Sequence, residues 1–154
     1  MWQVMAIGRL RDKPEAALFA RYAGRMRPNL GLVELAEARG APAEVKRREG
    51  AALLGALPAN AFVVVLDLGG ETVDSVRFAS QVERWLGLGR QVCFLIGGAE
   101  GLDAAVLARA DAVLSLGAMT WPHFLARAML AEQLYRARSI ATRHPYHRDG
   151  RPGA

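Results

Sequence analysis

A single α/β domain built around a parallel sheet is the fold that this sequence predicts. Apolar runs suited to strands alternate with segments of helical periodicity along the whole chain. Two of these runs, 62–66 and 92–96, are continuously apolar, which is typical of strands covered by helices on both faces. The 154 residues contain no internal repeat and no linker that could separate two domains, so we expect one domain over 1–154.

The expected elements follow one another in strict alternation. Strands are predicted at 2–7, 32–36, 61–67, 91–96 and 112–116. Helices are predicted at about 14–26, 43–56, 74–87, 103–109 and 122–141. Asp74 and Asp103 can cap the third and fourth helices, and Pro122 suits the first position of the last one.

The composition indicates a protein with a substantial core and no need for cross-links. Hydrophobic residues make up 52% of the chain, and its single cysteine, Cys93, lies inside an apolar run where a buried thiol is expected. The first eight residues are too short for a signal peptide and form the first strand instead. No stretch approaches the roughly 20 apolar residues that cross a bilayer. We therefore expect a cytoplasmic protein with no membrane partner.

The net charge of +5 is concentrated at the two ends of the chain. Residues 1–27 carry six basic and two acidic side chains, and residues 136–151 carry five arginines and one aspartate. Eighteen arginines against two lysines are what a GC-rich genome would produce, but such a bias does not explain the clustering at the ends. The distribution favours an anionic partner, such as a nucleic acid, that both ends contact.

Two predicted strands run into glycine pairs, at 69–70 and 97–98. Glycines at this position let the backbone turn tightly and let a ligand approach its amides, although an ordinary strand-to-helix turn would look similar. Neither turn has the lysine and hydroxyl residue of a phosphate-binding loop, and neither has three spaced glycines. These absences argue against a nucleoside triphosphatase and against a nicotinamide-dependent dehydrogenase.

The segment 114–123 contains no acidic or basic side chain except His123, although a surface connection is normally polar. An apolar loop with free main-chain groups can hold a flat purine and recognise its edge. A buried structural loop would have the same composition. Both interpretations stay open on these residues alone.

Four segments, taken together, resemble a known family. They are 95–102 (LIGGAEGL), 116–123 (LGAMTWPH), 132–137 (EQLYRA) and 144–148 (HPYHR), in this order. The chain resembles the ribosomal large-subunit pseudouridine N3-methyltransferases known as RlmH, within the SPOUT superfamily. The resemblance spans nearly the whole length, and the C-terminal half is its most specific part.

The resemblance implies a sheet with helices on both faces, and a C-terminal trefoil knot. It implies a homodimer that uses S-adenosyl-L-methionine to methylate N3 of a pseudouridine in a 23S rRNA stem-loop of the assembled ribosome. The cofactor would lie in the knotted loops. Position by position, the cofactor-binding residues would be Leu66, Gly97, Leu116, Gly117, Ala118, Met119, Thr120 and Trp121.

The chain departs from the family pattern at four places. Ala99 replaces a proline that is usual in the glycine turn, and Arg143 stands where an asparagine is frequent. The region 37–45 is shorter than in some relatives, and residues 149–154 extend beyond the usual end. No cofactor position is lost, whereas the changes near the tail affect the expected contact with RNA.

The basic tail, 143–154, supplies the expected catalytic residues. N3 of pseudouridine must lose a proton, and His147 or Tyr146 could accept it while Arg148 stabilises the anion on the base. His144 and His147 are equally explained as polar residues that face RNA. Two histidines without a nearby cysteine or carboxylate cluster predict no metal site.

Three other residues or segments have alternative explanations. Glu100 could orient the cofactor or the base, or favour a helix N-terminus, and Trp121 could stack on a base or belong to the core. The segment 122–141 has a broader apolar surface than one sheet face requires, so part of it is expected to form the dimer contact. Its apolar residues are Phe124, Ala128, Met129, Ala131, Leu134 and Tyr135.

Two other functions compete with methyl transfer. A non-catalytic RNA-binding or ribosome-binding module would not need the uncharged loop at 114–121 or the pair Gly97-Gly98. A different small-molecule enzyme would leave the basic ends unexplained. A measurement of S-adenosylmethionine binding would distinguish methyl transfer from these two alternatives.

Overall fold

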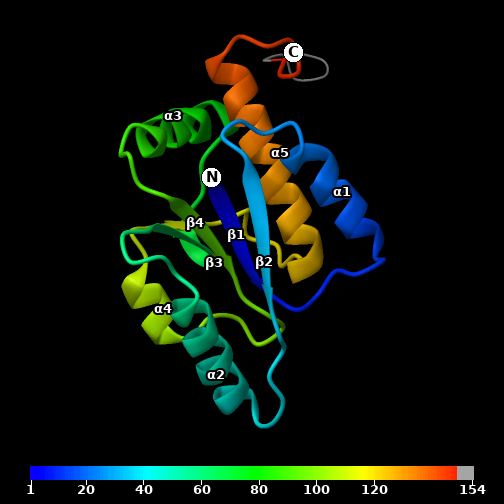
Figure 1. Ribbon diagram of the computed structural model, residues 1–154, viewed down its shortest axis with the longest axis vertical. Coiled ribbons are helices and arrows are strands. Elements are labelled where there is room, and N and C mark those ends of the chain that lie inside the picture. Colours follow the sequence, from blue (N-terminus) through cyan, green and yellow to red (C-terminus); the bar gives the residue numbers. More distant parts are fainter. Residues whose placement is uncertain (149–154) are drawn as a thin grey trace.

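The computed structural model describes residues 1–148 and confirms the α/β prediction (Figure 1). One parallel sheet contains all five strands of this part of the chain, in the order β2-β1-β4-β3-β5. The strands are β1 (Trp2–Ile7), β2 (Leu30–Leu35), β3 (Phe62–Glu71), β4 (Val92–Ile96) and β5 (Ala112–Leu114). Strand pairing does not address the trefoil knot, which stays a prediction.

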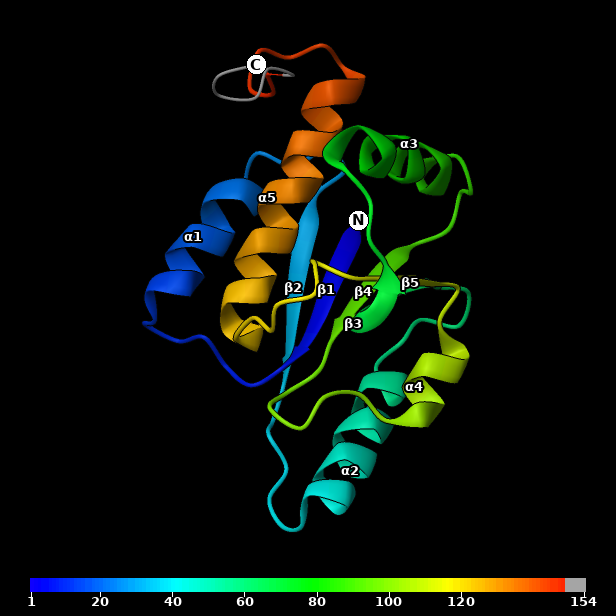
Figure 2. The same cartoon turned by 180° about the vertical axis from the view of Figure 1, so that it is seen from behind.

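Helices cover both faces of the sheet, as the continuous apolar strands predicted. One face carries α1 (Pro14–Ala23), α3 (Ser75–Leu86) and α5 (His123–Ala141), and the other carries α2 (Pro42–Gly55) and α4 (Ala104–Arg109) (Figures 1 and 2). The long helix α5 lies between α1 and α3. Most of its apolar residues are therefore used within the chain.

Each face of the sheet has its own core. Beneath α1, α3 and α5, the rings of Trp2, Phe94, Trp85 and Phe78 form a chain of tilted and edge-on contacts, with centroids 5.7 to 6.0 Å apart. Beneath α2 and α4 the core is formed mainly by aliphatic side chains, among them that of Leu53. All five residues of β4 are buried, because this central strand contributes to both cores. Cys93 belongs to it, and burial raises the pKa of its thiol to about 11.

The ends of the helices and strands that the sequence predicted agree with the structure to within a few residues. Two caps agree with the prediction, and two positions differ from it. Asp74 caps α3 by accepting a hydrogen bond from the Arg77 amide at 2.8 Å, as predicted, and Asp103 caps α4. Pro122 immediately precedes α5 rather than beginning it.

The second difference concerns the glycine pair Gly69-Gly70, which was expected to end the third strand. The strand instead continues to Glu71 through a shift in register against β5. A Cβ on Gly70 would lie 2.7 Å from the carbonyl carbon of Val113, so glycine here serves close packing of the strand and not only a turn.

One buried ion pair holds the start of α5 against the sheet. Arg127 is fully buried, its guanidinium lies 3.0 Å from the Glu34 carboxylate of β2, and it also donates to the carbonyl of Ile7 in β1. The same carboxylate accepts a hydrogen bond from the Leu10 amide at 2.6 Å. Three segments that are distant in sequence therefore meet at one charge pair.

Replacing Glu34 with glutamine tests this pair. Removing one partner would leave the Arg127 guanidinium buried without a counter-charge, which costs about 3 kcal/mol of unfolding free energy. The matched control is Glu44→Gln, because Glu44 forms an exposed ion pair with Arg47 and should contribute nothing measurable. Urea denaturation measures both, and equal effects from the two substitutions would contradict a special role for the buried pair.

Candidate functional site

A cavity of about 680 Å³ lies beyond the carboxyl ends of β3, β4 and β5. Its walls come from the end of β3, from the glycine turn after β4 and from the connection between β5 and α5. In open α/β sheets this edge is where ligands bind, and the volume suits a small molecule of nucleoside size. Leu68 of β3, and Met119 and Trp121 of the β5–α5 connection, are exposed apolar residues.

The connection between β5 and α5 is held in one shape by local hydrogen bonds. The Ser115 hydroxyl bonds to both the amide and the carbonyl of Gly117, at 3.2 and 3.0 Å. Gly117 has a φ of +115°, a conformation that only glycine adopts readily. The Trp121 indole N–H donates to the Leu116 carbonyl at 3.4 Å, which closes the loop from its other end. The loop therefore offers a preformed apolar wall.

The glycine turn after β4 forms the opposite wall. A Cβ on Gly97 would lie 3.0 Å from the backbone of Gly101, which folds back across the turn. A Cβ on Gly98 would lie 2.9 Å from the Glu49 carboxylate, a buried group of α2. Both glycines are thus required for packing as well as for an open cavity.

The structure brings most of the predicted cofactor residues to this cavity. Six of the eight line it: Leu66, Gly97, Leu116, Gly117, Thr120 and Trp121. Ala118 and Met119 belong to the same loop but do not line the cavity, and Met119 is 70% exposed. Cofactor binding by these residues stays a prediction.

Three titratable residues also line the cavity: Asp67, Glu100 and His123. Glu100 was singled out in the sequence as a residue that could orient a ligand. Asp67 and His123 were not assigned a role. The sequence signal for Asp67 was a carboxylate directly after the apolar run 62–66, and for His123 it was a titratable ring beside an otherwise uncharged loop.

The C-terminal tail lies at the other end of α5. The Tyr146 hydroxyl donates to Glu132 at 2.9 Å, and the Arg136 guanidinium lies 3.2 Å from Nδ1 of His147. Tyr135 packs against the Tyr146 ring with centroids 4.7 Å apart. From His123 to Glu132 the helix rises about 13.5 Å, and these tail residues do not line the cavity of their own chain.

The contacts of Tyr146 change its chemistry. Burial, followed by hydrogen bonds with Tyr22 and Glu132, raises the pKa of the Tyr146 hydroxyl well above its usual range. The hydroxyl therefore stays protonated and acts as a hydrogen-bond donor. Arg148 is exposed, and residues 149–154 of the predicted tail lie outside the described residues.

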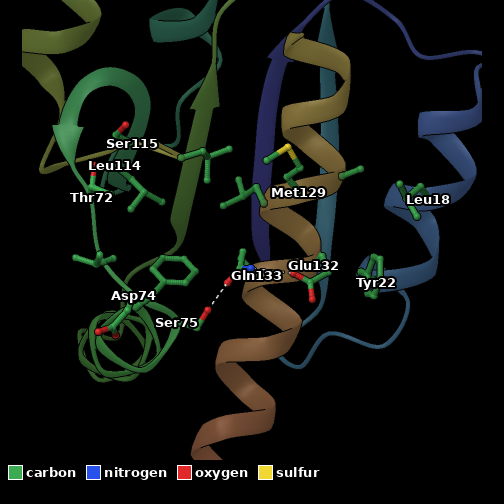
Figure 3. Close-up of a pocket in the computed structure, with 15 residues that line it drawn as sticks. Leu18, Tyr22, Thr72, Asp74, Ser75, Leu114, Ser115, Met129, Glu132 and Gln133 are labelled. Atoms are coloured by element: carbon green, nitrogen blue, oxygen red, sulfur yellow. Dashed lines mark hydrogen bonds between the residues drawn. The ribbon is translucent and has the colours of Figure 1, made fainter. Parts of the chain in front are cut away.

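A second hollow, of about 570 Å³, lies between α1, α3 and α5 (Figure 3). Leu18 and Tyr22 project from α1, and Met129, Glu132 and Gln133 project from α5 (Figure 3). The Ser75 hydroxyl of α3 donates to Gln133 at 3.0 Å across one end. We call this hollow the helical groove. Leu114 and Leu116 line both the groove and the cavity, so the two hollows share part of their walls.

The apolar residues predicted for a dimer contact divide into two groups. Ala128, Ala131 and Leu134 are buried in the core of their own chain, and Phe124 packs against that core. Met129 lines the helical groove, and Tyr135 packs against the tail. A dimer contact at α5 stays a prediction, and the groove is the part of the predicted surface that remains open.

Two other kinds of site are absent from residues 1–148. No group of three or more His, Cys, Asp or Glu side chains is arranged to hold a metal ion. In the same part of the chain, no helix has the length and apolar character to span a bilayer.

The chain is similar to known proteins over its whole length. The family model described as "Predicted SPOUT methyltransferase" matches residues 1–147. A protein of Gluconacetobacter diazotrophicus named "Ribosomal RNA large subunit methyltransferase H" is 67% identical over 150 residues, covering 97% of this chain and 99% of the relative. The protein of the same name from Acidiphilium cryptum is 54% identical, covering 97% and 95%.

A solved structure supports the fold assignment independently of close sequence similarity. The SpoU methyltransferase AviRb of Streptomyces viridochromogenes, solved with AdoMet, superimposes with a TM-score of 0.50 at 15% identity. The match covers 90% of this chain and 58% of that one. With the full-length relatives, these similarities show that the chain belongs to the ribosomal RNA large subunit methyltransferase H family of SPOUT methyltransferases.

Proposed function

We propose that this protein uses S-adenosyl-L-methionine to methylate N3 of a pseudouridine in a stem-loop of 23S rRNA, in the assembled ribosome. The observation that carries the proposal is the cavity beyond β3, β4 and β5, in a chain whose full-length relatives are named as large-subunit rRNA methyltransferases. The basic ends of the chain agree with an RNA substrate. The pseudouridine and its N3 atom come from the family resemblance.

The residues of the cavity fit the proposed cofactor. The uncharged loop 116–121 offers an apolar wall for the adenine, and Leu66 and Gly97 form the facing side. The carboxylates of Asp67 and Glu100 suit a ligand that carries a sulfonium and an ammonium group. When bound, the cofactor supplies an electrophilic methyl group.

A second copy of the chain would complete the site. Tyr146 and His147 lie against α5, Arg148 after them is exposed, and none of the three lines the cavity of their own chain. We place the target nucleotide between the cavity of one chain and the tail of the other, with the helical groove as part of the contact. Arg148 would contact phosphate or base and stabilise the anion that forms there.

The cofactor proposal is tested by replacing Gly97 with leucine. The added side chain should obstruct the cavity and lower the affinity for S-adenosylmethionine at least tenfold, as calorimetry would measure. Gly55→Leu is the matched control, because a Cβ on Gly55 meets no atom within 4 Å. Wild-type affinity in Gly97→Leu would show that the cofactor is wrongly placed.

The dimer proposal is tested by charging the helical groove. Met129→Glu should weaken association, because the carboxylate would have to be buried in an apolar contact. Light scattering at micromolar concentration should give twice the chain mass for wild type and for the control Leu88→Glu, which changes an exposed residue outside the groove. A monomeric wild type would remove the basis for a shared site.

The tail proposal is tested by ending the chain after Thr142. Cofactor affinity should change little, while methylation of ribosomes from a strain that lacks the enzyme should be lost. Arg148→Ala should weaken ribosome binding and reduce its dependence on salt, as expected for a lost phosphate contact. Full activity of the shortened chain would place the whole reaction within the loops around the cavity.

A further inference from the structure

His123, the first residue of α5, lies at the cavity with one ring nitrogen in an unusual environment. Its ring lines the cavity beside Trp121 and Ala126, and its side chain is 21% exposed. Nε2 is buried and makes no hydrogen bond with any residue of the described part. The nearest acidic atom is Oε1 of Glu37, 3.9 Å away.

The surroundings of His123 hold the ring in place. It packs against Phe124 with ring centroids 4.2 Å apart. Lys13 and Arg127 both lie over the Phe124 ring, at 4.5 and 5.0 Å from its centroid. The positive charges near the ring are Lys13, from the segment before α1, and Arg127 of α5, which pairs with Glu34 on β2. The negative charge near the ring is Glu37, after β2. Asp67 and Glu100 line the same cavity.

These surroundings favour the neutral ring. Burial and then Arg127 lower the pKa of His123, Lys13 lowers it further, and only Glu37 raises it. The positive end of the α5 dipole acts in the same direction as burial. A neutral imidazole at neutral pH has one nitrogen lone pair that can accept a proton.

The two tail residues are less suited to that task in the arrangement observed. Tyr146 donates its hydroxyl proton to Glu132, and its pKa is raised. A guanidinium has no acceptor, so the Arg136 contact at 3.2 Å uses the lone pair on Nδ1 of His147. Tyr146 thus keeps its proton, and Nδ1 of His147 is occupied by Arg136.

We propose that His123 accepts the N3 proton of the target pseudouridine, and that the charge of the Glu37 carboxylate, 3.9 Å from Nε2, orients the His123 ring. The inference rests on the proposed function and adds a catalytic residue to it. Glu37 is a positioning residue, because it acts through the imidazole and not on the base.

The step conserves atoms and charge. The N3–H bond breaks as its proton passes to the neutral imidazole of His123, and the electron pair left on N3 forms the new bond to the methyl carbon. The carbon–sulfur bond breaks, and its electrons stay on sulfur as S-adenosylhomocysteine. The imidazolium of His123 then releases its proton to solvent.

The central experiment compares wild type with His123→Asn in the full-length protein. Asparagine has no basic nitrogen, so the single-turnover rate on unmodified ribosomes at saturating cofactor should fall about 100-fold or more. Calorimetry should give an S-adenosylmethionine affinity within threefold of wild type. His123→Gln is the second variant, and thermal unfolding identifies which of the two is folded.

The pH profile separates proton transfer from a structural role. The wild-type rate should rise tenfold per pH unit while His123 is protonated and then level off above its pKa. In the asparagine variant the rate should keep rising with pH, because solvent must then remove the N3 proton. A variant that is merely distorted would keep the wild-type break.

A matched pair of glutamate variants tests the positioning role. Glu37→Gln removes the charge that raises the pKa of His123, so the NMR titration of its ring and the break in the rate profile should both move to lower pH. Glu44→Gln, which changes an exposed glutamate of α2, should move neither.

Three outcomes would overturn the inference. One is a folded His123 variant with more than a third of the wild-type rate, and another is an unchanged pH break in that variant. A loss of activity that saturating cofactor restores is the third, because it would make His123 a cofactor ligand. Mass spectrometry of wild-type product separates the two proposals: a methyl group elsewhere than N3 of a pseudouridine contradicts the proposed function, whatever the variants do.

Discussion

The buried guanidinium of Arg127 is the constraint on which the functional end of this fold depends. A charge at this depth is stable only when it is paired, and its two partners belong to β1 and β2. The start of α5 is therefore held against the carboxyl ends of these strands. The β5–α5 connection is then anchored at both ends, by β3 on one side and by this pair on the other. One wall of the cavity takes its shape from that double attachment.

Close approach at three glycines allows the other walls to form. A Cβ on Gly8 would lie 2.8 Å from a Glu37 oxygen, and one on Gly98 would lie 2.9 Å from a Glu49 oxygen. Gly70 lets β3 run against the backbone of β5. The glycines after the strands therefore admit carboxylates and neighbouring backbone as well as leaving space for a ligand. Because a glycine can serve either close packing or a turn, Gly69-Gly70 was wrongly expected to end a strand.

The sequence predicted the elements and the cavity loops better than it predicted the chemistry around them. Periodicity and capping residues depend on neighbours along the chain, so the order of elements and the cap at Asp74 were correct. The pairing of Arg127 with Glu34 joins residues 93 positions apart, and no local pattern reports such a contact. The same applies to His123 beside Glu37. The folding of Tyr146 onto Glu132 was missed because a polar sequence with prolines and glycines indicates a tail, but not where it packs.

Different parts of α5 contribute to the proposed cofactor site and to the proposed RNA-binding tail. The first residue of α5 lines the cavity, and its middle turns hold the tail by way of Glu132 and Arg136. The helix rises about 13.5 Å from His123 to Glu132 and about 20 Å from His123 to Arg136. A single chain therefore keeps the proposed methyl-donor site and the proposed RNA-binding tail apart. In a dimer with twofold symmetry, a tail that reaches the partner's cavity implies the reciprocal contact. Two equivalent sites would then form together, and dissociation would remove both.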